Sequence, residues 1–213
     1  MNKIFIDDNT FYYKGKLDSP IDNSSFLTKV KTILYQHPQF LLTSDSSYTP
    51  TDEPVRKTKV TPTKGQYISL ITSKFSTSET RKILEYATNF LSQTYNVPND
   101  FVFHSWVLFA DNKDERSYYH DHLDINGVQN QWSFCYYIQM PNNLEGNQGK
   151  LMFKTETEIE HATLPEEGDL IIFPGNLLHT PIEAVNSNKD RVVFCSNIAF
   201  SSLLSKKVEK SLL

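Results

Sequence analysis

The chain has 213 residues, of which 13% are aromatic, 22% are charged and only 7 are glycine. This composition is too aromatic and too weakly charged for a disordered chain, and it excludes collagen-like and glycine-rich linker architectures. The net charge of −4 excludes a chain-wide basic field that would attract nucleic acid or an anionic membrane. No apolar stretch approaches the roughly 20 residues of a membrane span, and the N-terminus lacks the apolar core of a signal peptide. We therefore expect one cytoplasmic domain over residues 1–213.

The first hundred residues predict mixed structure that supports the second half. Short strands are expected at Lys3–Phe5 and Thr10–Tyr13. A helix is expected to start at Ser24 or Ser25 as its N-cap and to end at Pro38. Its apolar residues follow the helical period, at Phe26, Leu27, Val30, Ile33 and Leu34.

Residues 43–66 are the segment least able to form a core. They are rich in Ser, Thr, Asp and Lys and include Pro50, Pro54 and Pro62. A structureless connection of about 20 residues is longer than ordinary loops. It is either a solvated surface loop or a flap over a substrate site.

A strand at Tyr67–Thr72 and a second helix complete this half. Ser76 and Glu79 have the spacing of a capping box, and Pro98 closes the segment. The helix carries one apolar stripe that predicts core packing, at Ile83, Leu84, Ala87, Phe90 and Leu91.

Residues 101–200 predict the core of a β protein. They contain short runs of β-branched and aromatic residues separated by turn residues, with no helical period. The expected strands are Phe101–Ala110, Trp132–Met140, Gly149–Lys154, Asp169–Phe173 and Val192–Phe200. This succession is typical of a sandwich or jelly roll. Cys135 and Cys195 lie inside the apolar runs and are expected to be buried free thiols.

One short segment concentrates groups that can ligate a metal. It has the sequence Tyr-His-Asp-His-Leu-Asp over 119–124, and alternate residues of an extended chain point to the same side. His122 and Asp124 can thus present an imidazole and a carboxylate to one ion, with His120 on the same side. His179, which follows an apolar strand and a Pro-Gly turn, can supply the second imidazole. Two histidines and one carboxylate on one side of an ion form the facial triad of non-haem Fe(II) oxygenases.

Arg191 follows His179 by 12 residues and opens an apolar strand. Its guanidinium is permanently charged and pairs with a carboxylate through two parallel hydrogen bonds. An arginine beside an apolar core needs an anionic partner, which a dicarboxylic co-substrate would supply.

In this order the motifs resemble the Fe(II)/2-oxoglutarate-dependent dioxygenases. More narrowly, they are similar to the 2-oxoglutarate–Fe(II) oxygenases of tailed phages and marine bacteria, which predicts action in a host cytoplasm. The matching residues span about half of the chain: Trp106; His120 and His122; Ser133-Phe134 through Ile138 to Pro141; Phe173-Pro174; His179; Arg191; and Asn197-Ile198.

The resemblance implies a double-stranded β-helix, jelly-roll or cupin-like, with flanking N-terminal helices. His122, Asp124 and His179 would bind Fe(II), and the distal carboxylate of 2-oxoglutarate would pair with Arg191. With O₂, the enzyme would hydroxylate a C–H bond and release succinate and CO₂. No catalytic residue beyond the metal ligands is implied.

Two positions depart from the family pattern. The superfamily often has serine two residues after the arginine, where this chain has Val193, so Tyr136 or Tyr137 would have to help hold the co-substrate. The phage-type pattern is His-x-His, which would make His120 a ligand in place of Asp124. We favour Asp124, because a carboxylate lowers the net charge of the Fe(II) site and suits oxygen-rich coordination.

Two other functions stay open on the sequence. A site of His120, His122 and His179 would suit a cupin-like metal enzyme that does not use 2-oxoglutarate. A non-catalytic β-sandwich binding module would keep the fold with a vestigial site. For an enzyme, the expected substrate is a small molecule or a protein side chain, with no nucleic-acid footprint and no membrane partner.

Overall fold

The computed structural model describes residues 1–36, 41–43, 66–69, 76–110, 119–122, 124–125, 128–129, 131–185 and 187–200. Its elements in chain order are β1 (Asn2–Phe5), β2 (Phe11–Lys16), α1 (Asn23–Gln36), β3 (Leu41–Thr43), β4 (Gln66–Ser69), α2 (Ser78–Tyr95), β5 (Phe101–Ala110), β6 (Asp124–Ile125), β7 (Val128–Gln129), β8 (Trp132–Gln139), β9 (Leu151–Lys154), β10 (Glu160–Thr163), β11 (Asp169–Pro174), β12 (Leu178–Pro181) and β13 (Arg191–Phe200). The expected mainly β class with N-terminal helices is confirmed. The expected loop at 43–66 lies outside the described residues except at its two ends.

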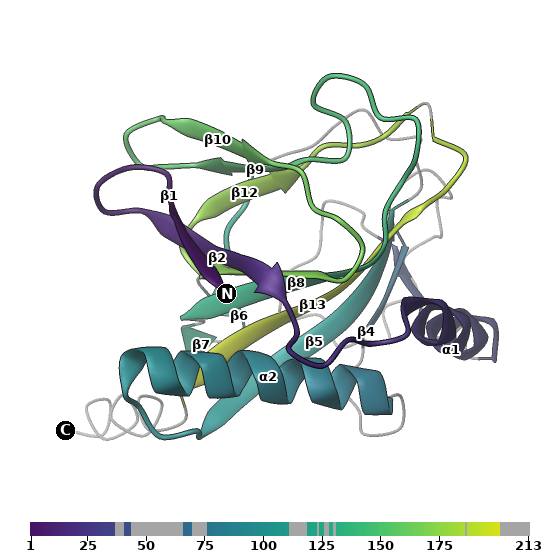
Figure 1. Cartoon of the computed structure of the whole chain (residues 1–213), viewed down its shortest axis with the longest axis horizontal. Coiled ribbons are helices and arrows are strands. Elements are labelled where there is room, and N and C mark those ends of the chain that lie inside the picture. Colours follow the sequence, from purple (N-terminus) through teal and green to yellow (C-terminus); the bar gives the residue numbers. More distant parts are fainter. Residues whose placement is uncertain are drawn as a thin grey trace.

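Most strands form one large antiparallel sheet and a small one that faces it, and β6 and β7 pair with each other in a separate two-stranded sheet. The large sheet has 8 strands in the order β1-β2-β11-β8-β13-β5-β4-β3, and the small sheet has 3, in the order β10-β9-β12. Figure 1 shows the small sheet on one side of the large one and helix α2 on the other. The large sheet is therefore covered on both faces, and two separate apolar cores are needed.

The outer core lies between the large sheet and the two helices. Phe26 and Val30 of α1 and Ile83 and Leu91 of α2 are at most 1% exposed, and they pack in one cluster with sheet residues such as Phe194. Burying such side chains contributes about 1.5–3 kcal/mol each before entropy is counted. The predicted stripe of α2 is thus confirmed as core packing.

The inner core lies between the two sheets. It contains Phe153 of β9 together with Ile171 and Phe173 of β11, none of which is exposed. Strand β13 contributes to both cores, because its successive side chains point to opposite faces: Phe194 belongs to the outer core, and Cys195 to the inner core.

The five strands expected between 101 and 200 are confirmed to within two residues at each end, as β5, β8, β9, β11 and β13. Strands β10 and β12 were not expected. Each has only four residues and contains polar side chains, so neither shows an apolar alternation, and each is extended because it pairs with β9. His179, which was expected to follow an apolar strand and a Pro-Gly turn, therefore lies within a further strand.

Helix α1 begins before the expected serines. The carboxylate of Asp22 accepts a hydrogen bond from the Ser25 amide (3.1 Å), and its carbonyl accepts the first helical bond, from the Phe26 amide (2.9 Å). The prediction of Ser24 or Ser25 as N-cap was wrong, because Asp22 supplies an equally good cap two or three residues earlier. Pro38, expected to close the helix, lies outside the described residues.

The N-cap of helix α2 also differs from the expected one, by one residue. Thr77 is the N-cap: its hydroxyl accepts from the Thr80 amide (3.2 Å), and the Thr80 hydroxyl accepts from the Thr77 amide (3.0 Å). The capping box of Ser76 and Glu79 was therefore wrong. The Glu79 carboxylate instead forms an ion pair with Lys29 of α1, which ties the two helices together.

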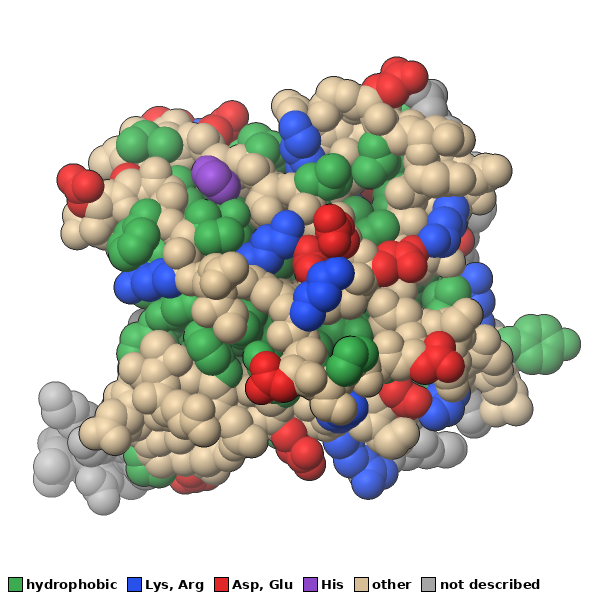
Figure 2. Space-filling model, viewed as in Figure 1, with side chains coloured by type: hydrophobic (Ala, Val, Ile, Leu, Met, Phe, Trp, Pro, Cys, Tyr) green, Lys and Arg blue, Asp and Glu red, His purple; other side chains and the backbone are tan. Residues whose placement is uncertain are grey.

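Charged side chains of both signs are interspersed on the face shown in Figure 2. Among the described residues, Lys16 of β2 forms ion pairs with Glu166 (3.2 Å) and Asp169 (3.9 Å). This face consequently offers no field of a single sign. Within the described part of the chain, none of the helices has the length and apolar character that crossing a membrane requires.

We expect Thr77→Ala to destabilise the protein by about 1 kcal/mol, because it removes the side-chain acceptor of the cap. Ser76→Ala is the matched control and should change the free energy of unfolding by less than half as much. Urea denaturation of both variants measures the difference. A larger loss for Ser76→Ala would restore the capping box that the sequence predicted.

Candidate metal centre

His120 and His179 are brought together by a pair of backbone hydrogen bonds. The His120 amide donates to the His179 carbonyl (3.1 Å), and the His179 amide donates to the His120 carbonyl (2.9 Å). Directly paired residues of antiparallel chains place their side chains on the same side. The amide of His122 in turn donates to the Gly175 carbonyl (2.8 Å), in the turn between β11 and β12. The segment that carries two histidines is thus tied to the strand that carries the third.

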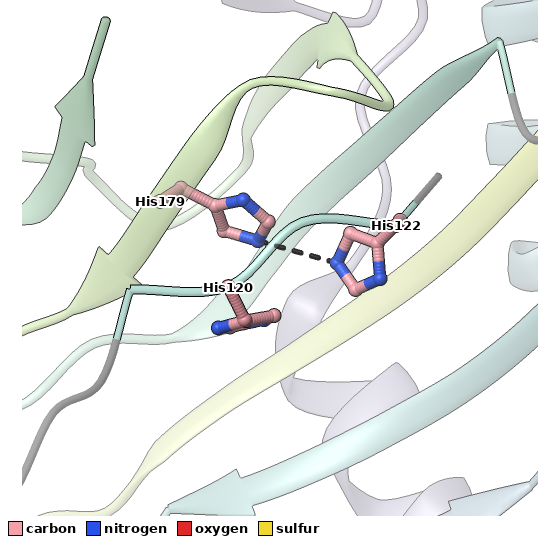
Figure 3. A group of neighbouring side chains, drawn as sticks. All are labelled: His120, His122 and His179. Atoms are coloured by element: carbon pink, nitrogen blue, oxygen red, sulfur yellow. Dashed lines mark hydrogen bonds between the residues drawn. The ribbon is translucent and has the colours of Figure 1, made fainter. Parts of the chain in front are cut away.

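The three imidazoles lie beside one another, and those of His122 and His179 point towards each other (Figure 3). One nitrogen from each of His120, His122 and His179 lies within 4.8 Å of the others. The ring centroids are 4.3 Å apart for His120 and His179 and 4.9 Å apart for His122 and His179. His179 is 4% exposed, His122 is half-buried and His120 is exposed, so the cluster runs from the protein interior to its surface.

The spacing of His122 and His179 fits two ligands of one ion. Their Nε2 atoms are 3.2 Å apart. Two nitrogens that each lie about 2.1 Å from a metal and meet at a right angle are separated by about 3 Å. The donor set is imidazole nitrogen, which suits iron, zinc and other divalent transition metals.

A hydrogen bond to the backbone decides which ring nitrogen of His179 can bind a metal. Nδ1 of His179 lies 2.9 Å from the Leu177 carbonyl oxygen, which can only accept. Nδ1 therefore carries the proton, and Nε2 presents its lone pair towards His122. A backbone carbonyl that holds the remote nitrogen in this way is a common outer-shell partner of a metal-binding histidine.

Burial keeps both inner imidazoles neutral. It lowers the pKa of His122 to about 3, with a further contribution from the nearby His120. Burial also holds the pKa of His179 well below its usual value. A metal ligand must offer an unprotonated nitrogen, so the site needs little proton release to bind an ion at neutral pH.

Aromatic side chains pack against the histidines from the protein interior. The rings of Phe173 and Phe153 lie 4.6 Å and 6.5 Å from that of His179, and Trp106 lies 5.8 Å from His122. Phe173 and Phe153 are fully buried. They exclude water from the inner side of the cluster and leave the His120 side as the open one.

Asp124, the expected carboxylate ligand, belongs to β6, where its backbone pairs with Gln129 of β7. Its side chain lies outside what the structure describes. His122 and His179 belong to both possible ligand sets, the one with Asp124 and the one with His120. Their imidazoles are in contact, and that of His120 lies next to them. The choice between Asp124 and His120 as third ligand stays a prediction.

Arg191 is buried at the start of β13 and already has an anionic partner. Its Nη2 donates to Glu183 Oε1 (3.1 Å) and its Nη1 to the Ile182 carbonyl (3.1 Å), while Nε is buried without a hydrogen-bond partner. Arg191 is 3% exposed and the Glu183 side chain 16%. A charge this deep requires a counter-ion, which Glu183 supplies.

The two tyrosines considered for the co-substrate lie on opposite faces of the large sheet. Tyr137 is opposite Val193 of β13, in the inner core, and the Arg191 charge acts on its hydroxyl. Tyr136 belongs to the outer core, where its hydroxyl donates to Asn23 of α1 (2.8 Å). Only Tyr137 is therefore on the face that carries Arg191.

The sequence did not single out Glu183. It lies four residues after His179, in the segment that leads from β12 towards β13. An ion pair between residues eight apart across an irregular segment has no sequence period, so only the folded chain reveals it.

The whole-chain comparisons identify the fold. No family model matches the chain, and no curated protein does. Solved structures do match: a prolyl-4-hydroxylase from Pseudomonas putida has 13% sequence identity and a TM-score of 0.60, covering 89% of this chain and 92% of its own. The carbocyclase SnoK of nogalamycin biosynthesis, described as non-haem and alpha-ketoglutarate-dependent, has 10% identity and a TM-score of 0.63, covering 89% and 79%.

A third match is the epimerase SnoN in complex with Fe3+, alpha-ketoglutarate and nogalamycin RO. It has 11% identity and a TM-score of 0.59, again covering 89% of this chain and 79% of its own. At these identities the likeness establishes the fold, and the expected jelly roll of the 2-oxoglutarate oxygenases is confirmed.

We expect His122→Ala and His179→Ala each to weaken the binding of Mn²⁺ by more than the roughly 10–100-fold that loss of an outer-shell partner costs. His161→Ala is the control, because that imidazole contacts Tyr12 and not the cluster. Calorimetric titration under anaerobic conditions measures the affinities. Equal affinities in all three variants would place metal binding elsewhere or exclude it.

Proposed function

We propose that this protein is an Fe(II)- and 2-oxoglutarate-dependent oxygenase that hydroxylates a C–H bond and releases succinate and CO₂. The single observation that carries the proposal is the convergence of His122 and His179 in this fold. The fold is that of enzymes whose reaction needs a metal with open positions, and the two Nε2 atoms have the spacing of adjacent ligands. The neighbours include a prolyl-4-hydroxylase and enzymes of nogalamycin biosynthesis, so a protein side chain and a small molecule both suit the fold as substrate.

In the proposed site His122 and His179 hold the iron with Asp124 as third ligand and His120 as the alternative. The bound ion would supply the oxidative chemistry with O₂ and 2-oxoglutarate. The chain contributes orientation through the Leu177 carbonyl on His179, and water exclusion through Phe153 and Phe173.

The co-substrate is proposed to direct its distal carboxylate to Arg191, with Tyr137 beside it. Arg191 Nε is a buried donor without a partner, and Tyr137 lies on the same face of the sheet. Glu183 already accepts a hydrogen bond from Nη2, so a second carboxylate that approaches the guanidinium meets the first one. Either Glu183 moves away or the two carboxylates share one guanidinium at a cost in affinity.

A cupin-like metal enzyme that does not use 2-oxoglutarate is the second candidate. The observation that favours it is the trio of His120, His122 and His179, which can hold an ion without any carboxylate. The two candidates differ in the co-substrate and in the third ligand, and the experiments below separate them.

Adding Fe(II) and then 2-oxoglutarate to the anaerobic protein is expected to produce the visible charge-transfer band of chelated iron. Admitting O₂ should then convert 2-oxoglutarate to succinate. Metal binding without the band would favour the cupin-like enzyme. If no metal binds, the result would favour a non-catalytic binding module that keeps the fold without the enzyme activity.

Asp124→Ala is expected to abolish iron-dependent succinate formation, whereas His120→Ala should retain it. The reason is that a carboxylate completes the facial triad and the exposed His120 does not. Metal affinity is measured alongside, so that loss of the ion is separated from loss of turnover. The opposite result would assign the site as three histidines.

Arg191 and Glu183 are best tested together, because removing one partner of a buried ion pair leaves the other uncompensated, at roughly 3–5 kcal/mol. Arg191→Met/Glu183→Gln is expected to bind 2-oxoglutarate at least about tenfold more weakly, since a charge-assisted hydrogen bond contributes roughly 1.5–3 kcal/mol. Its Mn²⁺ affinity should stay near that of the wild type. Parallel loss of both affinities would make Arg191 a structural residue.

Glu183→Gln alone is expected to act in the opposite direction and tighten 2-oxoglutarate binding severalfold. The substitution removes the carboxylate that competes for the guanidinium. Glu167→Gln, which breaks the more exposed pair with Lys189, is the matched control and should have no effect. Weaker 2-oxoglutarate binding by Glu183→Gln would mean that Glu183 positions Arg191 and does not compete for it.

A further inference from the structure

Cys135 and Cys195 form a pair that the metal centre does not use. Cys135 of β8 is the direct cross-strand partner of Cys195 of β13, and their sulfur atoms are 3.8 Å apart. These are the two cysteines of the chain, and both are free thiols. Directly opposed residues of antiparallel strands have Cα atoms about 4.5–5.5 Å apart, within the range of about 4.4–6.8 Å that a disulfide bridges.

The pair lies on the inner face of the large sheet, the face that also borders the histidines. Cys195 is opposite Trp106 of β5, and Trp106 packs 5.8 Å from the ring of His122. The two thiols and Trp106 pack in or against the inner core, in which Phe173 contacts His179. The thiols are therefore separated from the histidine cluster by single side chains.

The two thiols differ in access. Cys195 is 6% exposed, whereas Cys135 is half-buried although it lies in a central strand. The hydrogen bond with Cys135 and burial raise the pKa of the Cys195 thiol. Cys135 is thus the thiol that a small oxidant reaches first, and Cys195 is placed to react with it afterwards.

We propose that Cys135 and Cys195 are a redox modification site that a peroxide converts reversibly into an intramolecular disulfide. Cys135 sulfur attacks one peroxide oxygen, which gives a sulfenic acid and water. Cys195 sulfur then displaces the hydroxyl from Cys135, which forms the S–S bond and releases a second water. Two thiols lose two electrons in total, and hydrogen peroxide is reduced to two water molecules.

The movement that the reaction needs is small. The sulfur atoms must close from 3.8 Å to the S–S bond length of about 2.05 Å, which side-chain rotation can supply while the strand register is kept. Disulfides of this kind in reducing compartments are mostly transient and redox-sensing. A neighbouring centre that activates O₂ would be a local source of oxidant; that connection, unlike the site itself, rests on the proposed function.

The test uses the full chain with metal removed by a chelator, so its result does not depend on the proposed oxygenase activity. Reduced protein is treated with hydrogen peroxide, and thiols are counted after denaturation alongside the intact mass. The wild type is expected to lose both thiols, to lose the mass of two hydrogen atoms and to regain both thiols with dithiothreitol. Oxygen addition at Cys135 with Cys195 still titratable would overturn the proposal, as would a disulfide between two chains.

Single variants identify the order of events. Cys195→Val, which keeps an apolar side chain in the inner core, should add oxygen atoms to Cys135 and form no internal bond. Cys135→Ala should leave Cys195 reacting roughly tenfold more slowly than the wild-type pair, because the remaining thiol is buried. Circular dichroism confirms that each variant is folded. Equal thiol loss in Cys135→Ala and the wild type would contradict the proposed entry at Cys135.

Discussion

The two-residue period of the central strands is the constraint on which the rest of the structure depends. Every residue of β13 is buried, and its side chains alternate between the core under the helices and the core between the sheets. A shift of one residue in its register would exchange the two sets, putting Arg191 among the side chains of the outer core. The pairing of β13 with β5 over ten residues and with β8 on its other side prevents this shift.

The same alternation decides which polar groups can meet. Arg191, Tyr137 and Cys195 all belong to the inner face, whereas Tyr136, one residue from Tyr137, bonds to Asn23 on the outer face. The inner face of β5 is also less covered than its outer face: Trp106 is partly exposed, and Val107 is fully buried. Arg191, Tyr137 and Cys195 are therefore collected on the side of the large sheet that faces the small sheet.

The same alternation buries the charged side chain of Arg191, which then needs a partner of opposite charge. Its guanidinium is buried and is held by Glu183 and the Ile182 carbonyl. The partner comes from the segment that follows β12, the strand of His179, so the arginine and the histidine strand are linked by a short length of chain. The segment directly after the His179 strand thus supplies both groups that hold the guanidinium.

Much of the β core could be predicted because its strands carry their own pattern. Strands β5, β8 and β13 are long, apolar and β-branched or aromatic, so they were recognisable without their partners. Strand β12 was not, since its four residues, LHTP, are extended only because they pair with β9. The caps of α1 and α2 were misplaced because several Ser, Thr and Asp side chains lie near each helix start and each residue type can serve as an N-cap, so residue type alone does not select one.

The sequence by itself determined the residue types of the candidate site: two short blocks containing His120, His122 and His179, and an arginine opening an apolar strand. Local spacing is enough to place His120 and His122 on one side of the chain, because alternate residues of an extended chain share one side. Only the tertiary structure decided that His120 pairs with His179, that Glu183 neutralises Arg191 and that Cys135 faces Cys195. These contacts join residues that are distant along the chain or lie across an irregular segment, and they exist only after the strands have paired and the two sheets have packed.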